Sequence, residues 1–345
     1  MHACAFSEYG EPGVLRWQGL PDPEPGPGEV TIAVAACGVN HLDLDSRKGV
    51  SPWDYEFPHV LGGEFAGTIA ALGPGVEGWA AGDPVTAEHQ YACGVCDVCL
   101  RWHGELCPNY TFVGNDSWGA YGELVRIPAR LLIPLGSLEQ APIAATAQVA
   151  VSTAWSMVYR LAAIRPLETV LVPSASGGVG CSLVQCAKLA GARVIASVGS
   201  AAKAERVREL GADEVFVHAE VAPSAAVAEL TDGAGVDAVL DNTAGPLLGE
   251  HLACLRIDGR YAFCGAHAGE RVEVDMLRTF VRGHSILGFR LSTPDEIRTA
   301  IRLALDGRVR VPIDRSFPLA EAAAAHEYLE RREHVGKVLL TAAES

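Results

Sequence analysis

The sequence predicts an α/β protein built from two domains, a barrel-like β domain and a doubly wound parallel sheet. Three observations support this fold class. Short β-like runs are broken by glycine and proline in the first part, apolar strands alternate with amphipathic helices from about Leu167, and a glycine-rich loop follows the first of those strands. At 345 residues the chain is long enough for two hydrophobic cores. We expect residues 1–149 and 291–345 to form one domain and residues 150–290 the other.

The first part of the chain, to about residue 149, has the texture of a compact β domain. Turn signals such as Pro25-Gly26-Pro27-Gly28 and Gly73-Pro74-Gly75 separate short runs of β-forming residues. The clearest of these runs are Glu29–Ala35, Glu64–Ala70 and Tyr121–Ile127. Many short strands with this punctuation are typical of a barrel-like domain.

The second part alternates continuous apolar strands with amphipathic helices, which indicates βαβ crossovers and a parallel sheet covered on both faces. The expected strands are Thr169–Pro173, Arg193–Val198, Val215–Val217, Val236–Asp241, Arg260–Cys264 and Ser285–Phe289. The expected helices are Val179–Ala190, Ala201–Leu210 and Ser224–Leu230. The tail, with helices near Pro294–Leu305 and Leu319–Arg332 and a strand at Lys337–Thr341, is expected to rejoin the first domain.

The composition excludes some partners. A formal net charge of −15 argues against nucleic acid or an anionic membrane, since both require a basic face. The sequence contains no run of about 18 apolar residues, so we expect no membrane-spanning segment. The first residues have neither a basic segment nor an apolar core, so we expect no secretory leader and a cytoplasmic protein.

Four closely spaced cysteines predict a structural zinc site in a segment at about residues 88–112. Cys93, Cys96 and Cys99 follow one another at intervals of three, and Cys107 lies close behind. Zn²⁺ in a closed structural site prefers four such thiolates, with no position left for substrate. The alternatives are four free thiols in a loop or a disulfide pair, and a reducing compartment disfavours the latter. The remaining six cysteines are expected to be buried free thiols.

A phosphate-binding loop is predicted at the first βα turn, which reads Val172-Pro-Ser-Ala-Ser-Gly-Gly-Val-Gly180. Glycines at such a turn let the backbone approach a pyrophosphate, which then lies at the N-terminus of the following helix. Ser174 stands where the usual fingerprint has its first glycine, and a small serine should be tolerated there. The residues expected to contact the cofactor in this loop are Ser176, Gly177, Gly178 and Val179.

The end of the second strand of this domain predicts which dinucleotide is bound. NAD-dependent enzymes normally carry a carboxylate there for the ribose 2′-hydroxyl, but this segment reads Ser197-Val-Gly-Ser200. The hydroxyl of Ser200 and the ammonium of Lys203 suit a 2′-phosphate instead, so we expect NADPH. The alternative is that Lys203 belongs to a solvated helix face.

These features together resemble the medium-chain dehydrogenase/reductase superfamily over nearly the whole chain. The segments Asn40-His-Leu-Asp43-x₃-Arg47-x-Gly49 and Ser174-x-x-Gly177-Gly-Val-Gly180 are similar to its quinone oxidoreductase branch. The four cysteines resemble its zinc alcohol dehydrogenase branch. The resemblance implies a GroES-like catalytic domain and a Rossmann domain, with Gly336-Lys337 near the end of the chain.

The positions that hold a catalytic zinc in the alcohol dehydrogenases carry no ligand in this sequence. Asn40 stands at the thiolate position and Gly63 at the histidine position, and residues 140–155 contain no cysteine. Leu42 replaces the hydroxyl residue that passes the alcohol proton. A substituted site could still be drawn from other side chains, namely Cys37, Asp43, His59 and Glu64.

Without a Lewis acid, hydride transfer from NADPH requires a carbon that is already electrophilic, such as the β-carbon of an enone or quinone. We therefore expect an NADPH-dependent reductase of a conjugated carbonyl. Asn40 is the expected hydrogen-bond donor to the developing enolate oxygen, and Tyr55 the expected proton donor. His41 is expected to contact the cofactor phosphates or ribose, and Asp43 to orient the loop.

The resemblance also implies further contacts and an assembly. Thr153 matches a residue near the nicotinamide carboxamide, Asn242 a segment along the ribose, and Lys337 a basic residue that meets the pyrophosphate. The small-molecule substrate is not identified by the sequence. A homodimer is expected, pairing the edge strands Ser285–Phe289.

Three other functions are open at this stage. The chain could be a zinc alcohol dehydrogenase with substituted ligands, which would bind two zinc ions rather than one. It could be a non-catalytic or redox-sensing NADPH-binding protein, because a cofactor fold does not guarantee chemistry. It could also be a tailoring enzyme that acts on one elaborate metabolite.

Overall fold

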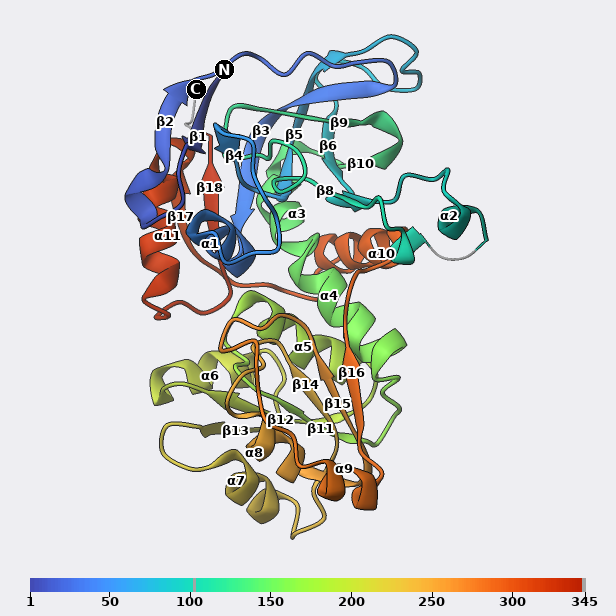
Figure 1. The fold of residues 1–345 in the computed structure, drawn as a ribbon, viewed down its shortest axis with the longest axis vertical. Coiled ribbons are helices and arrows are strands. Elements are labelled where there is room, and N and C mark those ends of the chain that lie inside the picture. The colour runs from blue at the N-terminus through green and yellow to red at the C-terminus, as the bar shows by residue number, and fades with distance from the viewer. Residues whose placement is uncertain (102–103, 343–345) are drawn as a thin grey trace. The chain divides into compact units, whose positions relative to one another are not determined.

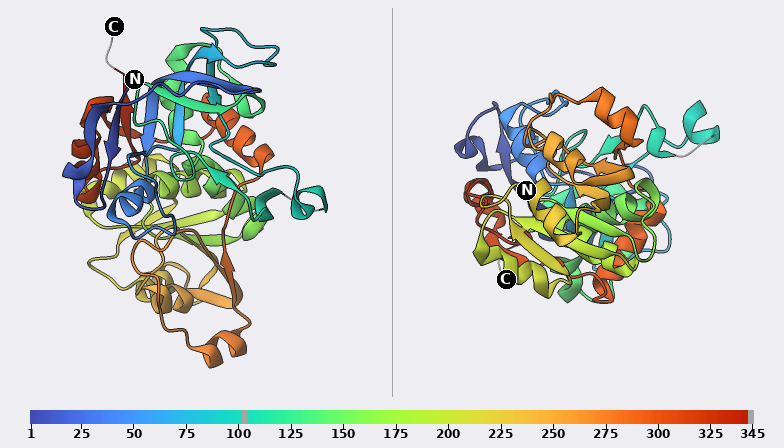
Figure 2. Two further views of the ribbon diagram at one scale, coloured as in Figure 1. Left: turned by 45° about the horizontal axis from the view of Figure 1, so that its top comes forward. Right: turned by 90° about the horizontal axis from the view of Figure 1, so that it is seen from below.

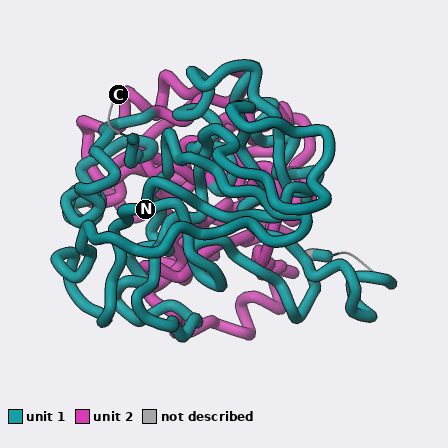
Figure 3. The backbone as a smooth tube through the Cα atoms, turned by 90° about the horizontal axis from the view of Figure 1, so that it is seen from above, with its two compact units in different colours: residues 1–149, 293–306, 313–345 teal, residues 150–292, 307–312 magenta. Residues whose placement is uncertain are grey.

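A computed structural model describes residues 1–101 and 104–342. The chain divides into two compact units (Figure 3). Unit 1 comprises residues 1–149, 293–306 and the segment from 313 onward, and unit 2 comprises residues 150–292 and 307–312. Unit 1 therefore ends at residue 149 and resumes at residue 293, and the short segment 307–312 of the tail belongs to unit 2.

Unit 1 is built around a seven-stranded sheet in which β3 is the long central strand (Figure 1). The sheet order is β10-β6-β5-β3-β18-β17, and β9 also pairs with β3. Its strands are β3 (Glu29–Val39), β5 (Glu64–Leu72), β6 (Pro84–Ala87), β9 (Leu124–Pro128), β10 (Leu132–Pro134), β17 (Ile313–Pro318) and β18 (Lys337–Thr341). The C-terminal strand β18 lies antiparallel to β3, so the tail rejoins the first part of the chain as expected.

Within the described residues, unit 1 also contains two smaller sheets and five α-helices. The smaller sheets are β2-β1-β4, with β1 (His2–Phe6), β2 (Arg16–Gly19) and β4 (His59–Val60), and β7-β8, with β7 (Gln90–Tyr91) and β8 (Thr111–Phe112). The helices are α1 (His41–Lys48), α2 (Asp97–Arg101), α3 (Ala141–Ala147), α10 (Pro294–Leu305) and α11 (Ala322–Glu330). The segment that carries α2 extends away from the rest of unit 1 (Figure 2).

The core of unit 1 lies where the sheets and helix α11 bury their apolar side chains. Its largest fully buried members include Phe6, Phe65 and Tyr121. The sequence predicted a strand beginning at Tyr121, but β9 begins at Leu124. Tyr121 instead exchanges backbone hydrogen bonds with two other segments, donating to Leu61 and accepting from Cys4. The tertiary partners of Tyr121 therefore overrule its local β propensity.

Unit 2 is a six-stranded parallel sheet in the order β13-β12-β11-β14-β15-β16, which is the Rossmann order. Its strands are β11 (Thr169–Val172), β12 (Arg193–Val198), β13 (Glu214–Val217), β14 (Val236–Asp241), β15 (Leu255–Phe263) and β16 (Ser285–Gly288). Its helices are α4 (Ala150–Ser156), which continues into the π-helical turn η5 (Met157–Leu161), α5 (Gly178–Leu189), α6 (Ala201–Glu209), α7 (Pro223–Leu230), α8 (Leu248–Ala253) and α9 (Met276–Arg282). The predicted α/β fold class is confirmed.

Two short helices of unit 2, α8 and α9, escaped prediction. Helix α9 has clear local signals, because the Asp275 carboxylate accepts from the backbone N–H of Arg278 and Gly283 ends the helix at a φ of 66°. Its apolar side chains, Met276, Leu277, Phe280 and Val281, are all exposed, so it lacks the amphipathic pattern on which the prediction relied. Among the described residues, no helix has the length and apolar character needed to cross a bilayer.

Candidate functional site

The four predicted zinc ligands converge in space. The sulfur-to-sulfur distances are 3.5 Å for Cys96–Cys99, 3.6 Å for Cys93–Cys107, 3.8 Å for Cys96–Cys107 and 3.9 Å for Cys93–Cys99. A tetrahedral ion with Zn–S bonds of about 2.3 Å places its ligands about 3.8 Å apart. The side chains therefore fit one zinc ion. Within the described ranges, no other group of three or more His, Cys, Asp or Glu side chains gathers closely enough to hold a metal.

Backbone hydrogen bonds favour the thiolate form of Cys93, the form that binds a metal. The turn before α2 directs the backbone N–H groups of Val95 and Cys96 at Cys93, and these hydrogen bonds lower the pKa of that thiol to about 6. The other six cysteines of the sequence are buried free thiols, as expected.

A buried ion pair lies where the sequence has lost the catalytic zinc ligands. The Lys337 ammonium is 2.7 Å from the Glu64 carboxylate, and both side chains are almost fully buried. Asn40, at the vacant thiolate position, binds both partners. Its Oδ1 accepts from Lys337 at 2.6 Å, and its Nδ2 donates to Glu64 at 3.1 Å. The sequence predicted that Lys337 contacts the coenzyme pyrophosphate. It indicated Glu64 only as a possible ligand of a substituted zinc site.

Gly63, at the vacant histidine position, has no room for a side chain. A Cβ atom there would lie 2.7 Å from the backbone oxygen of Val113. The other substitute ligands are also engaged elsewhere: the Nε2 of His59 lies 3.0 Å from the backbone oxygen of Gly114, and burial raises the pKa of the Cys37 thiol well above its ordinary value. Among the described residues, Cys37, Asp43, His59 and Glu64 therefore do not gather as a set of metal ligands.

Asp43 is buried at the start of helix α1 and joins a second polar network. Its Oδ2 accepts from the backbone N–H of Asn40 at 2.8 Å and from the Tyr121 hydroxyl at 3.1 Å. The Tyr121 hydroxyl also lies 3.0 Å from Nε2 of the buried His326. Burial outweighs these hydrogen bonds and raises the pKa of Asp43 to about 6. Asp43 thus holds the backbone N–H of Asn40, the residue before helix α1.

Tyr55 lies in the same unit and is partly buried. Its hydroxyl donates to Oδ1 of Asn115 at 2.7 Å and lies 3.3 Å from the Ser51 hydroxyl. Burial raises the pKa of Tyr55, so its hydroxyl stays protonated at neutral pH. The ring of His41 lies near that of the buried His334, with 6.5 Å between centroids.

The phosphate loop of unit 2 connects β11 to helix α5, with Gly177 as the residue before the helix. A Cβ atom on Gly180 would lie 2.5 Å from the backbone oxygen of Ser174, so only glycine fits there, whereas a Cβ on Gly177 would meet nothing within 4 Å. Ser174 has a φ of 50°, a left-handed conformation that glycine usually adopts, which explains why the fingerprint has glycine at this position. Ser176 lies in this turn, and Gly178 and Val179 are the first two residues of helix α5.

The end of β12 carries the groups expected to distinguish the two dinucleotides. Ser200 precedes helix α6, and the backbone N–H of Lys203 donates to its carbonyl oxygen. Sequence reasoning missed His218, whose Nδ1 lies 3.3 Å from the Ser197 hydroxyl. Burial, followed by the positive charges of His251 and Lys203, lowers the pKa of His218. The only available signal was its place directly after the strand β13.

Asn242 follows β14, and its side-chain nitrogen is buried with no hydrogen-bond partner in the described chain. The preceding residue, Asp241, is firmly held. Its Oδ2 lies 2.9 Å from the Nδ1 of His251 and accepts from the Tyr261 hydroxyl at 2.8 Å. Despite burial, hydrogen bonding and the charge of His251 lower the pKa of Asp241 to about 2. The side-chain N–H groups of Asn242 are thus buried donors directly after a firmly held residue. Thr153 is buried in helix α4 of the same unit.

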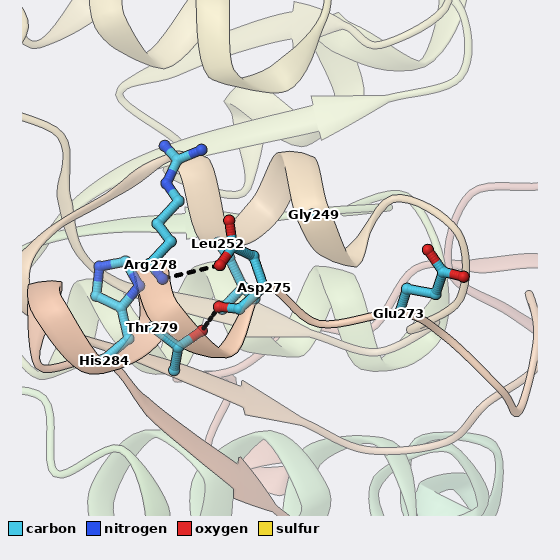
Figure 4. A pocket seen from close by; sticks show the side chains of 7 residues that line it. All are labelled: Gly249, Leu252, Glu273, Asp275, Arg278, Thr279 and His284. Carbon is cyan, nitrogen blue, oxygen red and sulfur yellow. Dashed lines mark hydrogen bonds between the residues drawn. The ribbon is translucent and has the colours of Figure 1, made fainter.

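A small cavity of about 100 Å³ lies between α8 and α9 and is shown in Figure 4. The Asp275 carboxylate and backbone oxygen already accept from the backbone N–H of Arg278 and the hydroxyl of Thr279. The cavity is smaller than sites for small organic ligands, which measure about 300–1,000 Å³. It is therefore not a candidate for the coenzyme or the substrate.

Comparison with known families matches both units of the chain. Residues 26–137 match the alcohol dehydrogenase GroES-like domain, and residues 178–306 match the zinc-binding dehydrogenase family. Among solved structures, an NAD-dependent alcohol dehydrogenase superposes with a TM-score of 0.93 and 37% identity, over 99% of this chain and 100% of that one. A mycobacterial protein complexed with NADPH superposes with a TM-score of 0.81 and 33% identity, over 99% and 100%.

Curated relatives differ in activity. Acryloyl-coenzyme A reductase of Metallosphaera sedula is 30% identical over 93% of this chain and 94% of its own. An NAD-dependent alcohol dehydrogenase of Saccharolobus solfataricus is 31% identical over 99% of each chain. The phthioceranic/hydroxyphthioceranic acid synthase of Mycobacterium tuberculosis is 31% identical over 92% of this chain. The matched region covers only 14% of the length of that much longer protein.

Proposed function

The chain belongs to the medium-chain dehydrogenase/reductase superfamily, and on that premise we propose that it is an NADPH-dependent oxidoreductase that reduces a conjugated carbonyl without a catalytic zinc. The observation that carries this proposal is the set of residues at the former ligand positions. Asn40 is bound between Lys337 and Glu64, and Gly63 has no space for a side chain. A conjugated carbonyl needs no Lewis acid, since its own π system spreads the developing charge.

Residues 150–290 would form the NADP(H)-binding domain. Ser176, Gly177, Gly178 and Val179 would hold the pyrophosphate at the N-terminus of α5. The remaining contacts would be made by Ser200, Lys203, Asn242 and Thr153. The absence of a carboxylate in the sequence at the end of β12 supports NADPH over NADH.

The chemistry can be divided between the coenzyme and the protein. When bound, NADPH would supply a hydride for the β-carbon of the substrate. As that C–H bond forms, electrons move toward the carbonyl oxygen, and a proton then completes the reduction at the α-carbon. We assign the hydrogen bond to the carbonyl oxygen to the Asn40 amide and the proton to the Tyr55 hydroxyl, which its raised pKa keeps protonated. Asp43 would hold the loop of Asn40, and His41 would contact the cofactor.

The substrate class is tested by following NADPH oxidation with a panel of enones, enoyl thioesters, quinones and simple ketones. The similarity to an acryloyl-coenzyme A reductase supports the inclusion of enoyl thioesters. We expect turnover of the conjugated compounds only. Asn40→Ala and Tyr55→Phe should each lower kcat/KM by about tenfold or more and leave the Kd for NADPH unchanged. Unchanged rates in both variants would refute the assignment of these residues.

The second candidate function is a zinc alcohol dehydrogenase, which the similarity to alcohol dehydrogenases favours. Metal analysis separates the two candidates. One structural zinc held by Cys93, Cys96, Cys99 and Cys107 predicts about one zinc per chain, whereas a catalytic site adds a second. A second zinc together with oxidation of simple alcohols would favour the dehydrogenase. Four reduced thiols also agree with the cytoplasmic location that we propose.

A homodimer is part of this proposal. Strand β16 forms one edge of the six-stranded sheet, and the adjoining helix α9 exposes Met276, Leu277, Phe280 and Val281 at 69–80%. Such an apolar surface beside an open strand edge is suited to a second copy of the chain. Light scattering should give the mass of a dimer for the wild-type protein and that of a monomer for Phe280→Asp. A monomeric wild-type protein would refute the dimer.

A further inference from the structure

Lys337 has a complete set of hydrogen-bond acceptors within unit 1. Its ammonium group donates to the backbone oxygen of Val39 at 2.9 Å and to Oδ1 of Asn40 at 2.6 Å, and it lies 2.7 Å from Oε2 of Glu64. An ammonium group has three N–H donors, so all three are used. The side chain is only 4% exposed. In this arrangement Lys337 has no N–H left for a coenzyme phosphate.

Strand register brings these groups together. Gly38 of β3 pairs with Glu64 of β5, and Val39 of β3 pairs with Val338 of β18; these three strands are labelled in Figure 1. The Lys337 ammonium group therefore reaches Asn40. Gly38 makes room for the carboxylate, because a Cβ atom there would lie 2.7 Å from Oε2 of Glu64. The other carboxylate oxygen accepts from the backbone N–H of Val149 at 2.9 Å. The carboxylate is therefore held at both oxygens.

The two charges determine the orientation of the Asn40 amide. A lysine ammonium can only donate and a carboxylate can only accept, so the amide oxygen must face Lys337 and the amide nitrogen must face Glu64. A flipped amide would bring its NH₂ group against the ammonium and its oxygen against the carboxylate. The observed orientation leaves one N–H of Asn40 outside the ion pair.

We propose that Lys337 and Glu64 are positioning residues that clamp the Asn40 carboxamide in one orientation and so present its second N–H as the donor to the substrate carbonyl oxygen. This inference rests on the proposed function of Asn40. Stability alone does not require the two charges, because a buried ion pair is often no more stabilising than uncharged side chains of similar volume. A fixed dipole, by contrast, needs no reorganisation when charge develops on the substrate.

The test is the double variant Lys337→Met/Glu64→Gln, which removes both charges and leaves neither one buried alone. The matched control is Arg298→Met/Glu88→Gln, which removes another ion pair of unit 1, 2.8 Å long, that shares no residue with the cluster of Asn40, Glu64 and Lys337. At saturating NADPH we expect kcat for a conjugated carbonyl to fall by about tenfold or more in the first variant. Its substrate KM and its Kd for NADPH should stay within about twofold, and the control should resemble the wild type.

Two kinetic outcomes would overturn the clamp. An increase in the Kd for NADPH with unchanged kcat would identify Lys337 as a phosphate contact. Unchanged kcat and Kd together would leave the ion pair with a purely structural role.

A second readout does not require turnover. The Nδ2 proton of Asn40 that faces Glu64, assigned with Asn40→Ala, should show slow hydrogen exchange in the wild type and in the control, and fast exchange in the Lys337→Met/Glu64→Gln protein. Equal exchange in all three proteins would overturn the clamp. If the wild type reduces no conjugated carbonyl but the exchange pattern is as expected, the proposed function fails while the clamp geometry stands.

Discussion

Replacing Asp43 with asparagine should change how the stability of unit 1 depends on pH. Burial raises the pKa of Asp43 from its ordinary value of 3.8 to about 6, so the folded protein binds this proton more tightly than the unfolded chain. The resulting stabilisation is fully present below the unfolded pKa and is lost as the pH rises through about 6. A shift of about two units corresponds to about 3 kcal/mol over the whole window.

Part of that window lies in an accessible pH range. Between pH 8 and pH 5.5, about half a unit below the folded pKa, linkage gives the wild type a gain of about 1 kcal/mol that Asp43→Asn cannot show. Urea unfolding followed by tryptophan fluorescence measures it, because Trp17, Trp53, Trp79 and Trp118 lie in unit 1. Asp45→Asn, a half-buried position on the same helix, serves as the control.

The comparison uses the difference between wild type and variant at each pH, so that titration of other groups cancels. The gap should shift by about 1 kcal/mol in favour of the wild type as the pH falls, and the control should show no such shift. A shift of the opposite sign would mean that Asp43 is held ionised by its hydrogen bonds, and the reasoning on burial would be refuted.

Three further predictions concern the coenzyme and the metal. Gly180→Ala should weaken NADPH binding by about tenfold or more, because the added Cβ would lie 2.5 Å from the backbone oxygen of Ser174. Gly177→Ala, whose Cβ meets nothing within 4 Å, should change the Kd by less than about twofold. Calorimetry measures both Kd values, and equal effects would contradict the steric argument. Cys99→Ser should abolish zinc binding, measured as the zinc content per chain by atomic emission. The segment at about residues 88–112 should then become sensitive to proteolysis while NADPH binding persists. Retention of the metal would argue against a four-thiolate site. Lys203→Glu should lower the preference for NADPH over NADH by about tenfold, measured as the ratio of the two kcat/KM values. Arg208→Glu, on the same helix, is the control and should leave this ratio unchanged. An unchanged ratio in Lys203→Glu would show that Lys203 only faces solvent.

Local sequence patterns determined the fold class and the metal site. The alternation of apolar strands with helices identified the parallel sheet, because both faces of such a sheet are buried and its strands read as continuous apolar runs. The intervals between Cys93, Cys96 and Cys99 identified the four-thiolate cluster, because ligands only a few residues apart can reach one ion without a large fold around them. The glycines of the phosphate loop could be identified from the sequence for the same reason, because the conformation of this turn depends on neighbouring residues in the chain.

The tertiary structure alone decided what surrounds Asn40. The pairing of β18 with β3 brings Lys337 to a residue almost 300 positions earlier in the chain, and the pairing of β3 with β5 adds Glu64. The sequence showed that the zinc ligands were missing, but it could not show that a buried ion pair holds the amide at the thiolate position. Strand register between distant segments depends on the packing of the whole sheet, and no local pattern of residues encodes it.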